Sequence, residues 1–253
     1  MELNDKVFII TGGSSGLGAA TAEVFAAAGA RIAVFDRDEA HGKTVAQATG
    51  AKFYPVDVTD DRAVQQAVDD VVGHFNVIHG AVNCAGIAIA ARVVGKQGVH
   101  SLDAFHRVLL VNVVGTFNVV RCVAWAISQL PSGEEEERGV IINTASIAAF
   151  EGQIGQAAYS ASKGAVAGMT LPIARELAHY GIRVMTIAPG IFDTPMLGLL
   201  SEDIRRSLSA QIPFPSRLGS PKEYALLAQH IVENPMLNGE IIRLDGAIRM
   251  GPR

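Results

Sequence analysis

The stretch Thr11-Gly12-Gly13-Ser14-Ser15-Gly16-Leu17-Gly18 follows a short apolar run, residues 7–11, and precedes an alanine-rich stretch, residues 16–28. The apolar run predicts a buried strand, and the alanine-rich stretch predicts a helix that Gly29 ends. Glycines between a strand and a helix allow a tight turn and let the backbone approach a pyrophosphate at the helix N-terminus. The spacing Gly-x-x-x-Gly-x-Gly is a weak signal by itself and also fits a plain loop, but the flanking strand and helix are those the mechanism requires.

Alternation of strand and helix continues along the chain. Residues 87–101 look irregular, and residues 191–216 look like a mixture of loop and helix. Strands that are apolar throughout and alternate with helices indicate a parallel sheet covered on both faces. We therefore expect an α/β protein with one domain, residues 1–253, in a Rossmann fold: a doubly wound parallel sheet of about seven strands with helices on both faces. The further expected strands are 31–35, 52–56, 78–83, 139–145, 182–188 and 240–244, and the further helices are 38–48, 60–73, 102–129, 157–180 and 221–233.

Composition excludes several classes of function. The hydrophobic content of 49% suffices for a large core, and a net charge of −4 without a basic block argues against nucleic-acid binding. No uninterrupted apolar run reaches about 18 residues, so no membrane partner is expected. A strand-like run begins by Val7, which leaves no recognisable leader and favours a cytoplasmic location. Cys84 and Cys122 lack metal-ligand or disulfide spacing, so we expect reduced thiols and no metal.

Three local features carry structural expectations. The acidic run of residues 134–137 follows Pro131-Ser-Gly133 and is expected to be a solvated loop. Pro172 falls inside the helix expected over 157–180 and should bend it or weaken one hydrogen bond. Asp60 is expected to cap the helix that begins beside it.

Tyr159 and Lys163 are four residues apart at the start of a predicted helix. Side chains at i and i+4 share a helix face. A free Tyr titrates near pH ~10, too high for a general base at neutral pH, and a nearby ammonium group would lower that pKa. The pair therefore suits acid–base catalysis, although the same spacing also fits an ordinary helix face with an exposed Lys.

Acidic and small residues end the predicted strands at the edge where open sheets bind ligands. Asp36 stands 18 residues after Gly18, where a carboxylate binds the adenosine ribose and repels a 2′-phosphate, which favours NAD over NADP. Arg37 would partly offset this repulsion, and Asp36 is alternatively a turn or cap residue. Asp57-Val58 could meet the adenine amino group, and Asn83-Cys84-Ala85-Gly86 would let the cofactor lie close to the backbone.

Six motifs stand in the order found in the classical short-chain dehydrogenase/reductase family, which the chain resembles over nearly its whole length. They are Thr11-Gly-x-x-x-Gly-x-Gly18, Asn83-Cys-Ala-Gly86, Asn112, Ser146, Tyr159-x-x-x-Lys163 and Pro189-Gly190. Within that family, five further segments resemble the type II 3-hydroxyacyl-CoA dehydrogenases, which also act on hydroxysteroids. These segments span residues 140–146, 150–153, 155–163, 212–219 and 242–250.

The resemblance implies a role for each catalytic residue. Tyr159 would be the general acid and base, and Lys163 would support it electrostatically and hold the nicotinamide ribose. Ser146 would hydrogen-bond the substrate oxygen, and Asn112 would hold a water that links Lys163 to solvent. The structural alternatives are a helix cap or turn for Ser146 and a core amide bonded to backbone for Asn112.

The resemblance also implies the contacts of an NAD cofactor. Two positions depart from the family pattern: Cys84 stands where many members have Asn, and Asp193 stands where a small residue is expected. Asp193 would have to point outward to solvent for the site to keep its form. The expected cofactor-binding residues are Gly12, Ser15, Leu17, Asp36, Asp57, Val58, Cys84, Gly86, Tyr159, Lys163, Phe192 and Thr194.

Substrate contacts are expected beside Tyr159. Gln156, three residues earlier, could touch the carbonyl of a 3-ketoacyl thioester, together with Ser146 and Tyr159. The apolar residues of 191–216 read as a lid over an apolar substrate or as ordinary packing. Arg92 and Lys96 could meet CoA phosphates, although exposed solubilising charge is the simpler interpretation.

The favoured hypothesis is an NAD-dependent oxidoreductase that interconverts 3-hydroxyacyl-CoA and 3-ketoacyl-CoA and also acts on hydroxysteroids, with Tyr159 as acid and base. A 3-oxoacyl-carrier-protein reductase is the second, and Asp36 argues against it because such enzymes usually use NADPH. A non-catalytic scaffold that holds NAD is the third, and the intact catalytic set argues against it. The resemblance implies a homotetramer.

Overall fold

A seven-stranded parallel sheet forms the centre of the computed structural model, which describes residues 1–96, 98–131, 137–198 and 201–252. The strand order is β3-β2-β1-β4-β7-β8-β9, and every pair is parallel. This order reverses between β1 and β4, as in a doubly wound fold, so the predicted sheet is confirmed. The strands are β1 (Val7–Thr11), β2 (Arg31–Asp36), β3 (Lys52–Pro55), β4 (Gly80–Asn83), β7 (Gly139–Thr144), β8 (Ile182–Pro189) and β9 (Ile241–Leu244).

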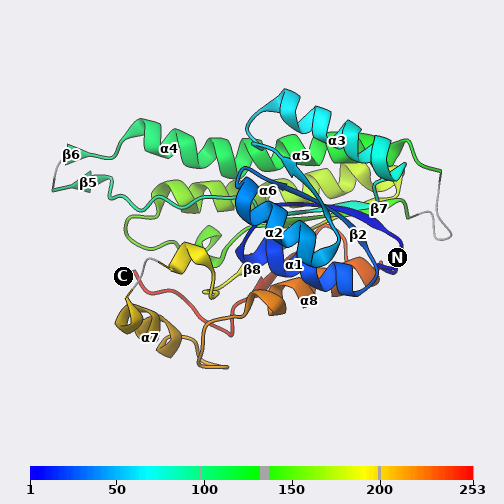
Figure 1. Ribbon diagram of the computed structural model, residues 1–253. Coiled ribbons are helices and arrows are strands. Elements are labelled where there is room, and N and C mark those ends of the chain that lie inside the picture. The colour runs from blue at the N-terminus through cyan, green and yellow to red at the C-terminus, as the bar shows by residue number, and fades with distance from the viewer. Residues whose placement is uncertain (97, 132–136, 199–200, 253) are drawn as a thin grey trace.

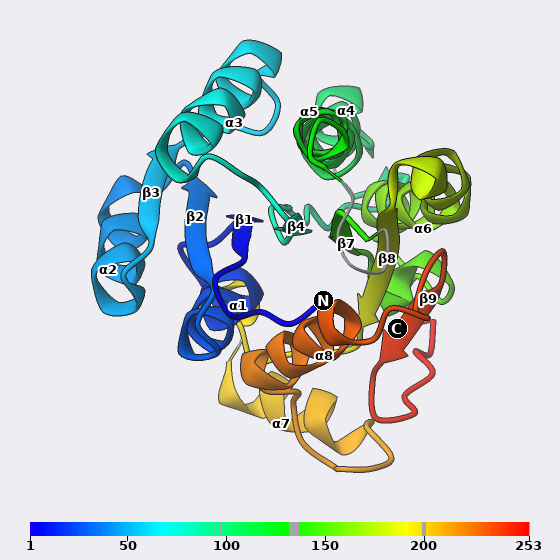
Figure 2. The same cartoon turned by 90° about the vertical axis from the view of Figure 1, so that its right-hand side faces the viewer.

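Helices cover both faces of the sheet (Figure 2). One face carries α3 (Asp61–Phe75), α4 (Leu102–Leu109), α5 (Thr116–Ser128) and α6 (Ala157–Leu177). The opposite face carries α1 (Gly16–Ala27), α2 (Glu39–Thr49) and α8 (Pro221–Glu233). Helix α7 (Glu202–Ala210) has no buried residue and lies outside both layers (Figure 1).

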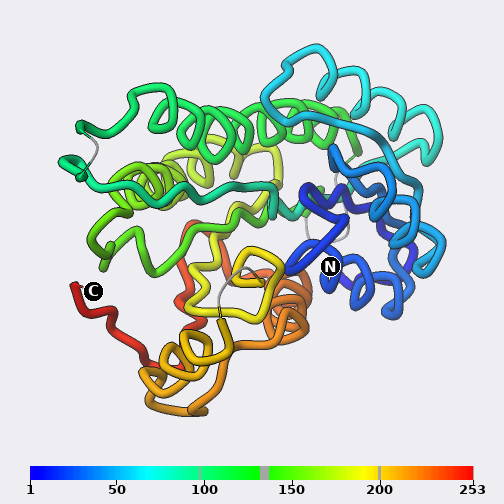
Figure 3. The backbone as a smooth tube through the Cα atoms, turned by 60° about the vertical axis from the view of Figure 1, so that its left-hand side comes forward, coloured from blue at the N-terminus to red at the C-terminus, as the bar shows by residue number. Residues whose placement is uncertain are grey.

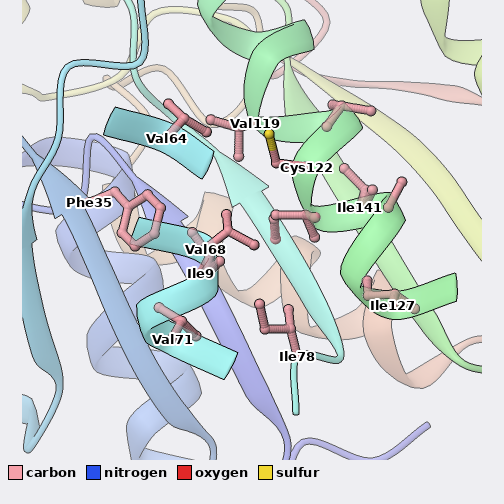
Figure 4. Packing of buried hydrophobic residues seen from close by; sticks show 14 of the residues in the cluster. Ile9, Phe35, Val64, Val68, Val71, Ile78, Val119, Cys122, Ile127 and Ile141 are labelled. Atoms are coloured by element: carbon pink, nitrogen blue, oxygen red, sulfur yellow. The ribbon is translucent and has the colours of Figure 1, made fainter. Parts of the chain in front are cut away.

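Alternate residues of each central strand feed two separate cores. Val7 and Ile9 point to the core under α3 and α5, whereas Phe8 and Ile10 point to the core under α1 and α8. This is the two-residue period of a strand that is buried on both faces. Figure 4 shows the first core, where strand residues Ile9, Phe35 and Ile141 meet Val64, Val68 and Val71 of α3 and Val119 and Ile127 of α5.

Helix α4 continues without a break through η1 (Leu110–Gly115) into α5, and the backbone tube in Figure 3 shows this path. The helix expected over 102–129 is confirmed, but its π-helical middle was not predicted. By length and composition the segment Leu102–Ser128 is apolar enough to cross a membrane, since its most apolar 18-residue window has a mean hydropathy of 1.7. More than half of its most apolar window, 56%, is buried, and Asn112 and Asn118 bond neighbouring segments, which is the pattern of a core helix.

Other elements differ from expectation in detail. Strands β5 (Val94–Gly95) and β6 (Gly98–Val99) form a small antiparallel hairpin in the stretch expected to be irregular, far from the N-terminus in Figure 1. Helix α6 runs through Pro172 without ending. Asp60 caps α3 as predicted, because its carboxylate accepts the backbone N–H groups of Arg62 and Ala63. Short 3₁₀ turns complete the set: η2 (Ile147–Ala149), η3 (Ala178–Tyr180) and η4 (Pro195–Leu197).

The expectation of a solvated acidic loop is wrong for its last residue. Glu137 is largely buried and accepts from the Arg183 guanidinium at 2.7 Å and from the N-terminal amine at 2.9 Å. Residues 134–136 lie outside the described residues. A charge run in sequence does not reveal which member meets a buried partner, and here Arg183 lies 46 residues further along the chain.

Candidate active site

The glycine-rich turn lies at the switch point between β1 and β4. Gly12 has φ of +64°, and a Cβ atom there would lie 2.7 Å from the backbone nitrogen of Ala85. A Cβ at Gly18 would collide with the carbonyl oxygen of Gly12. Only glycine therefore fits either position, because the turn packs directly against the backbone after β4 and against itself. Ser15 is the exposed N-cap of α1, and its side chain makes no capping hydrogen bond. Its hydroxyl and the helix N-terminus suit a pyrophosphate, so these residues fit a dinucleotide cofactor.

Asp36 ends β2 with its carboxylate turned to this glycine turn. One oxygen accepts the backbone N–H of Ser14 and the other accepts that of Asp38, each at 3.0 Å. Asp36 therefore stabilises the turn, which was the alternative interpretation of this residue. It also places a negative charge beside the glycine turn. Arg37 lies 3.4 Å from the carboxylate of Asp57, so its charge is partly offset there.

The adenine end of the site follows β3. Asp57 accepts hydrogen bonds from both the backbone N–H and the hydroxyl of Thr59, which hold its pKa below the ordinary value against the opposing effect of burial. Val58 is buried, and its carbonyl accepts from the Asn118 amide at 2.9 Å. Asn118, from α5, thus holds the loop that carries Asp57 and Val58, and the sequence offered no signal for it.

Small residues after β4 lie beside Lys163. A Cβ at Gly86 would lie 3.2 Å from Asn112 Oδ1 and 3.6 Å from Lys163 Nζ. Cys84 packs beside the core under α1, as does Leu17. Burial raises the pKa of the Cys84 thiol, so it stays protonated at neutral pH.

Ser146, Tyr159 and Lys163 come together where β7 ends and α6 begins. Ser146 caps the turn η2, as its alternative interpretation proposed, since its Oγ accepts the Ala148 N–H at 3.1 Å. The Ser146 side chain also lies close enough to the Tyr159 hydroxyl to favour its ionised form. The Lys163 ammonium lies 5.8 Å from the Tyr159 ring centroid and donates to the Thr144 carbonyl at 2.7 Å.

The protonation states differ from the sequence-based expectation. Burial raises the pKa of Tyr159, which the nearby Ser146 side chain only partly opposes. Burial also lowers the pKa of Lys163 to about 8. The predicted net fall of the Tyr159 pKa is therefore wrong for this structure, because burial raises it and the Lys163 ammonium donates to the Thr144 carbonyl rather than to the phenol. Tyr159 is thus a proton donor at neutral pH.

Asn112 is fully buried in the π-helical segment η1. Its Oδ1 accepts the Ile87 N–H at 2.8 Å, and its Nδ2 donates to the Ile87 carbonyl and to Ser162 Oγ, both at 2.9 Å. The side chain is therefore the backbone-bonded core amide of the alternative interpretation. The backbone carbonyl of Asn112 accepts from the Thr116 hydroxyl at 2.8 Å, so a water that linked Lys163 to solvent through that carbonyl would share it with Thr116.

The segment 191–216 is only partly packed. Phe192 and Ile212 are buried and belong to core clusters, whereas Met196 and Phe214 are exposed. Thr194 meets the glycine turn, since a Cβ at Gly16 would lie 3.4 Å from its side chain. The Asp193 side chain is 55% exposed and pairs with Arg205, so it points outward as the site requires. Two apolar residues of the segment, Leu199 and Leu200, lie outside the described residues.

Gln156 is the residue before α6, three positions from Tyr159. Its Oε1 accepts the backbone N–H of Gln153 at 3.0 Å, which fixes the side chain. Arg92 lines an open hollow of about 340 Å³ with Val93, Val94, Ile154 and Gly155. Lys96 is exposed on the hairpin. Among the described residues, no cluster of His, Cys, Asp or Glu has the makings of a metal site.

Comparisons with known proteins agree with this geometry. A family model described as short chain dehydrogenase matches residues 6–205. The chain is 56% identical to human 3-hydroxyacyl-CoA dehydrogenase type-2 over 250 aligned residues. The alignment covers 97% of this chain and 96% of the human protein. The chain is 52% identical over 254 residues to the protein of that name from Drosophila melanogaster, covering 99% of this chain and 100% of that protein.

A solved structure extends the likeness to three dimensions. The crystal structure of 3-hydroxyacyl-CoA dehydrogenase type-2 from Mycobacterium avium has a TM-score of 0.92 and 37% identity, and covers 99% of this chain and 98% of that chain. The resemblance found in the sequence motifs is thereby confirmed. The chain therefore belongs to the short-chain dehydrogenase family and is an oxidoreductase that uses a nicotinamide cofactor.

Proposed function

We propose that the protein is an NAD-dependent 3-hydroxyacyl-CoA dehydrogenase that interconverts 3-hydroxyacyl-CoA and 3-ketoacyl-CoA, with activity on hydroxysteroids as well. The observation that carries the proposal is the joint placement of Ser146, Tyr159 and Lys163 at the carboxyl edge of the sheet, beside the glycine turn. Relatives that carry this activity in their names, at 52% and 56% identity, support the substrate class.

The proposed mechanism follows from the protonation states. The bound nicotinamide supplies the hydride chemistry. In the reducing direction, Tyr159, which its raised pKa keeps protonated at neutral pH, gives its proton to the substrate oxygen. Ser146 donates a hydrogen bond to the same oxygen as charge develops there. In the oxidising direction Tyr159 accepts the proton, and the Lys163 ammonium on the same helix face stabilises the phenolate that forms.

The preference for NAD rests on Asp36. Its carboxylate is held by Ser14 and Asp38 at the position where a 2′-phosphate would lie, and like charges there repel. Arg37, the nearest candidate to offset this repulsion, lies beside Asp57. This arrangement also disfavours a 3-oxoacyl-carrier-protein reductase that uses NADPH. The catalytic constellation disfavours a scaffold without turnover.

The acyl-CoA would lie between Gln156 and the segment 191–216. Gln156, held by Gln153, would contact the thioester carbonyl, and the exposed Met196 and Phe214 would close over the acyl chain as a lid. Arg92, in the open hollow beside Gly155, would approach the CoA phosphates, with the exposed Lys96 near by in sequence.

We further propose a homotetramer in the cytoplasm. Large apolar side chains are exposed on three helical segments, as surfaces that pair with other copies require. Both cysteines are free thiols, which suits a reducing compartment. Light scattering on the purified protein would test the assembly: a monomeric mass would contradict it. The exposed side chains are Val114 of η1, Phe117 and Trp125 of α5, and Leu171 of α6.

The function is tested by the initial rate of acetoacetyl-CoA reduction, with NADH and NADPH run side by side. Fast NADH oxidation with little NADPH use is the expected result. Equal rates with both nucleotides would contradict the role of Asp36 but leave the substrate standing. No rate with either nucleotide, on protein that binds NADH, would overturn the acyl-CoA assignment and direct the assay to hydroxysteroids and other secondary alcohols.

A further inference from the structure

Tyr224 of α8 is buried completely, yet its hydroxyl reaches the carboxyl edge of the sheet. The hydroxyl oxygen lies 2.7 Å from Thr144 Oγ1 and 3.7 Å from Cys84 Sγ. Helix α8 covers the face of the sheet opposite to α6, which carries Tyr159 and Lys163. The tyrosine therefore approaches the catalytic edge from behind, and the reaction scheme above gives it no role.

The hydrogen bonds in this cluster run in one direction. Thr144 Oγ1 lies 2.6 Å from the backbone carbonyl oxygen of Asn83, which can only accept. The single hydroxyl proton of Thr144 is therefore donated to that oxygen. Tyr224 must then donate to Thr144, and the Cys84 thiol, whose sulfur lies 3.7 Å from both hydroxyl oxygens, donates to Tyr224. The chain of donors thus runs from Cys84 through Tyr224 and Thr144 to the carbonyl at the end of β4. Each hydroxyl both donates and accepts, as a buried polar network requires.

Thr144 stands where one side of β7 loses its partner strand. Pairing between β4 and β7 ends at Asn83 and Asn143, whereas pairing between β7 and β8 continues to Thr144 and Ile187. On the β4 side, Thr144 is therefore held by its own hydroxyl rather than by a strand ladder. Tyr224 supplies the second hydrogen bond to that hydroxyl.

The carbonyl of the same residue holds the catalytic lysine. Thr144 O accepts from Lys163 Nζ at 2.7 Å, and both groups are buried. We propose that Tyr224 is a positioning residue: its hydroxyl, acting through Thr144, fixes the carbonyl that orients the Lys163 ammonium toward Tyr159 and the cofactor. This inference rests on the proposed role of Lys163 in the reaction.

The pH dependence of turnover should report this contact. The titratable groups that face Lys163 are Tyr159 on its own helix and Cys84 after β4; the Asn112 side chain is neutral. Burial lowers the pKa of Lys163 to about 8, and the carbonyl opposes this because it accepts from the ammonium form. A carbonyl that drifts away would let the pKa fall further. The alkaline limb of the reduction rate would then move to lower pH.

The test compares Tyr224→Phe with Tyr54→Phe. Tyr54 is also buried, but its hydroxyl has no hydrogen-bond partner among the described residues, so it controls for the loss of a buried hydroxyl alone. For Tyr224→Phe we expect kcat with NADH to fall by about 10- to 100-fold, as for a small misplacement of a catalytic group. We expect the alkaline limb to move down by about half a pH unit, with KM for acetoacetyl-CoA within about twofold. Tyr54→Phe should change none of these.

Variants of Thr144 separate positioning from stability. Thr144→Val removes the hydroxyl that bonds Tyr224, and Thr144→Ser keeps it. Thr144→Val should therefore match Tyr224→Phe, and Thr144→Ser should retain the wild-type pH profile. The double variant Tyr224→Phe/Thr144→Val should be no worse than Thr144→Val alone, because both act through one hydrogen bond. If Tyr224→Phe does not fold, the Thr144 pair decides the question in the same assays.

Two outcomes contradict different parts of the argument. A folded Tyr224→Phe or Thr144→Val with the wild-type kcat and pH profile would overturn the positioning role. Lys163→Met with undiminished turnover would overturn the proposed role of Lys163 itself. If Lys163→Met lost turnover while Tyr224→Phe kept the wild-type kcat and pH profile, only the positioning role of Tyr224 would be overturned.

Discussion

The two edges of the central sheet both bury polar side chains, yet they use them in opposite ways. At the amino edge, His79 directly precedes β4, Glu137 precedes β7, and Arg183 is the second residue of β8. At the carboxyl edge lie Ser146, Tyr159 and Lys163. Burial alone does not distinguish the two groups. The two groups differ in whether their protein partners leave hydrogen-bond donors free to bind a ligand.

The amino edge is closed by internal partners. The Arg183 guanidinium donates to Glu137, to the Ile231 and Leu237 carbonyls and to the Val232 carbonyl, at 2.7 to 2.8 Å. Glu137 also binds the N-terminal amine. These contacts tie β8 to the end of α8 and to the start of the chain. Such a cluster serves stability and has no capacity left for chemistry.

The carboxyl edge keeps its donors available. Ser15 caps α1 without a side-chain bond, and Lys163 has one protein acceptor described for its three N–H groups. Its polar residues are mostly neutral, so burial costs them less than it costs the ions of the other edge. The comparison predicts that substitutions at the two edges separate activity from stability, and the following experiments test this, from the largest expected effect to the smallest.

Tyr159→Phe should abolish most turnover and leave the fold intact. Loss of a positioned general acid costs about 10² to 10⁴ in rate, which is about 3 to 5 kcal/mol. The measurement is kcat for acetoacetyl-CoA reduction, with NADH binding followed by fluorescence and unfolding by circular dichroism. Retained turnover would mean that another group supplies the proton.

Arg183→Ala should have the opposite signature. It leaves Glu137 buried without its main partner, and breaking a buried ion pair costs about 3 to 5 kcal/mol. Urea unfolding measures the loss, and the remaining folded protein should keep the wild-type KM values. Glu137→Gln serves as the matched control for the other half of the pair. A variant with unchanged stability would show that the amino edge does not hold the sheet together.

His79 should make the amino edge sensitive to acid. Burial, with smaller effects from Lys6 and Arg31, lowers its pKa to about 4, and its Nδ1 accepts the Val7 N–H at 3.0 Å. As the pH falls, the unfolded state takes up a proton on His79 before the folded state does. The contribution of neutral His79 to the free energy of unfolding is therefore complete above pH ~6.5 and is lost as pH falls toward 4, by up to about 3 kcal/mol.

The control for His79 is His79→Asn, which keeps an acceptor near Val7 but does not titrate. Unfolding free energies at pH 7 and pH 4.5 should differ less in the variant than in the wild type. Equal differences would assign the acid sensitivity to other groups.

Asp36→Asn should give the smallest effect and sharpen the view of the carboxyl edge. Asn keeps one acceptor for the Ser14 or Asp38 N–H but removes the charge. The preference for NADH over NADPH, measured as the ratio of kcat/KM values, should fall about tenfold, or about 1.4 kcal/mol. An unchanged ratio would exclude Asp36 as the selector.

Local patterns predicted most of the fold and several residues that meet at the candidate active site. The strand periods of residues 7–11, the glycine spacing and the four-residue step from Tyr159 to Lys163 each depend on neighbours in sequence, and all have the expected geometry. The same logic failed where a residue's surroundings come from distant segments. Glu137 was expected in solvent, and the Tyr159 pKa was expected to fall rather than rise.

The sequence by itself determined the doubly wound sheet, the dinucleotide turn and the catalytic motif, because strand period, glycine spacing and helix period are properties of short stretches of chain. Only the tertiary structure decided how those residues are held. Tyr224 meets Thr144 across 80 positions, and Asn118 meets Val58 across 60. Desolvation and long-range hydrogen bonds depend on packing, so no local pattern carries them.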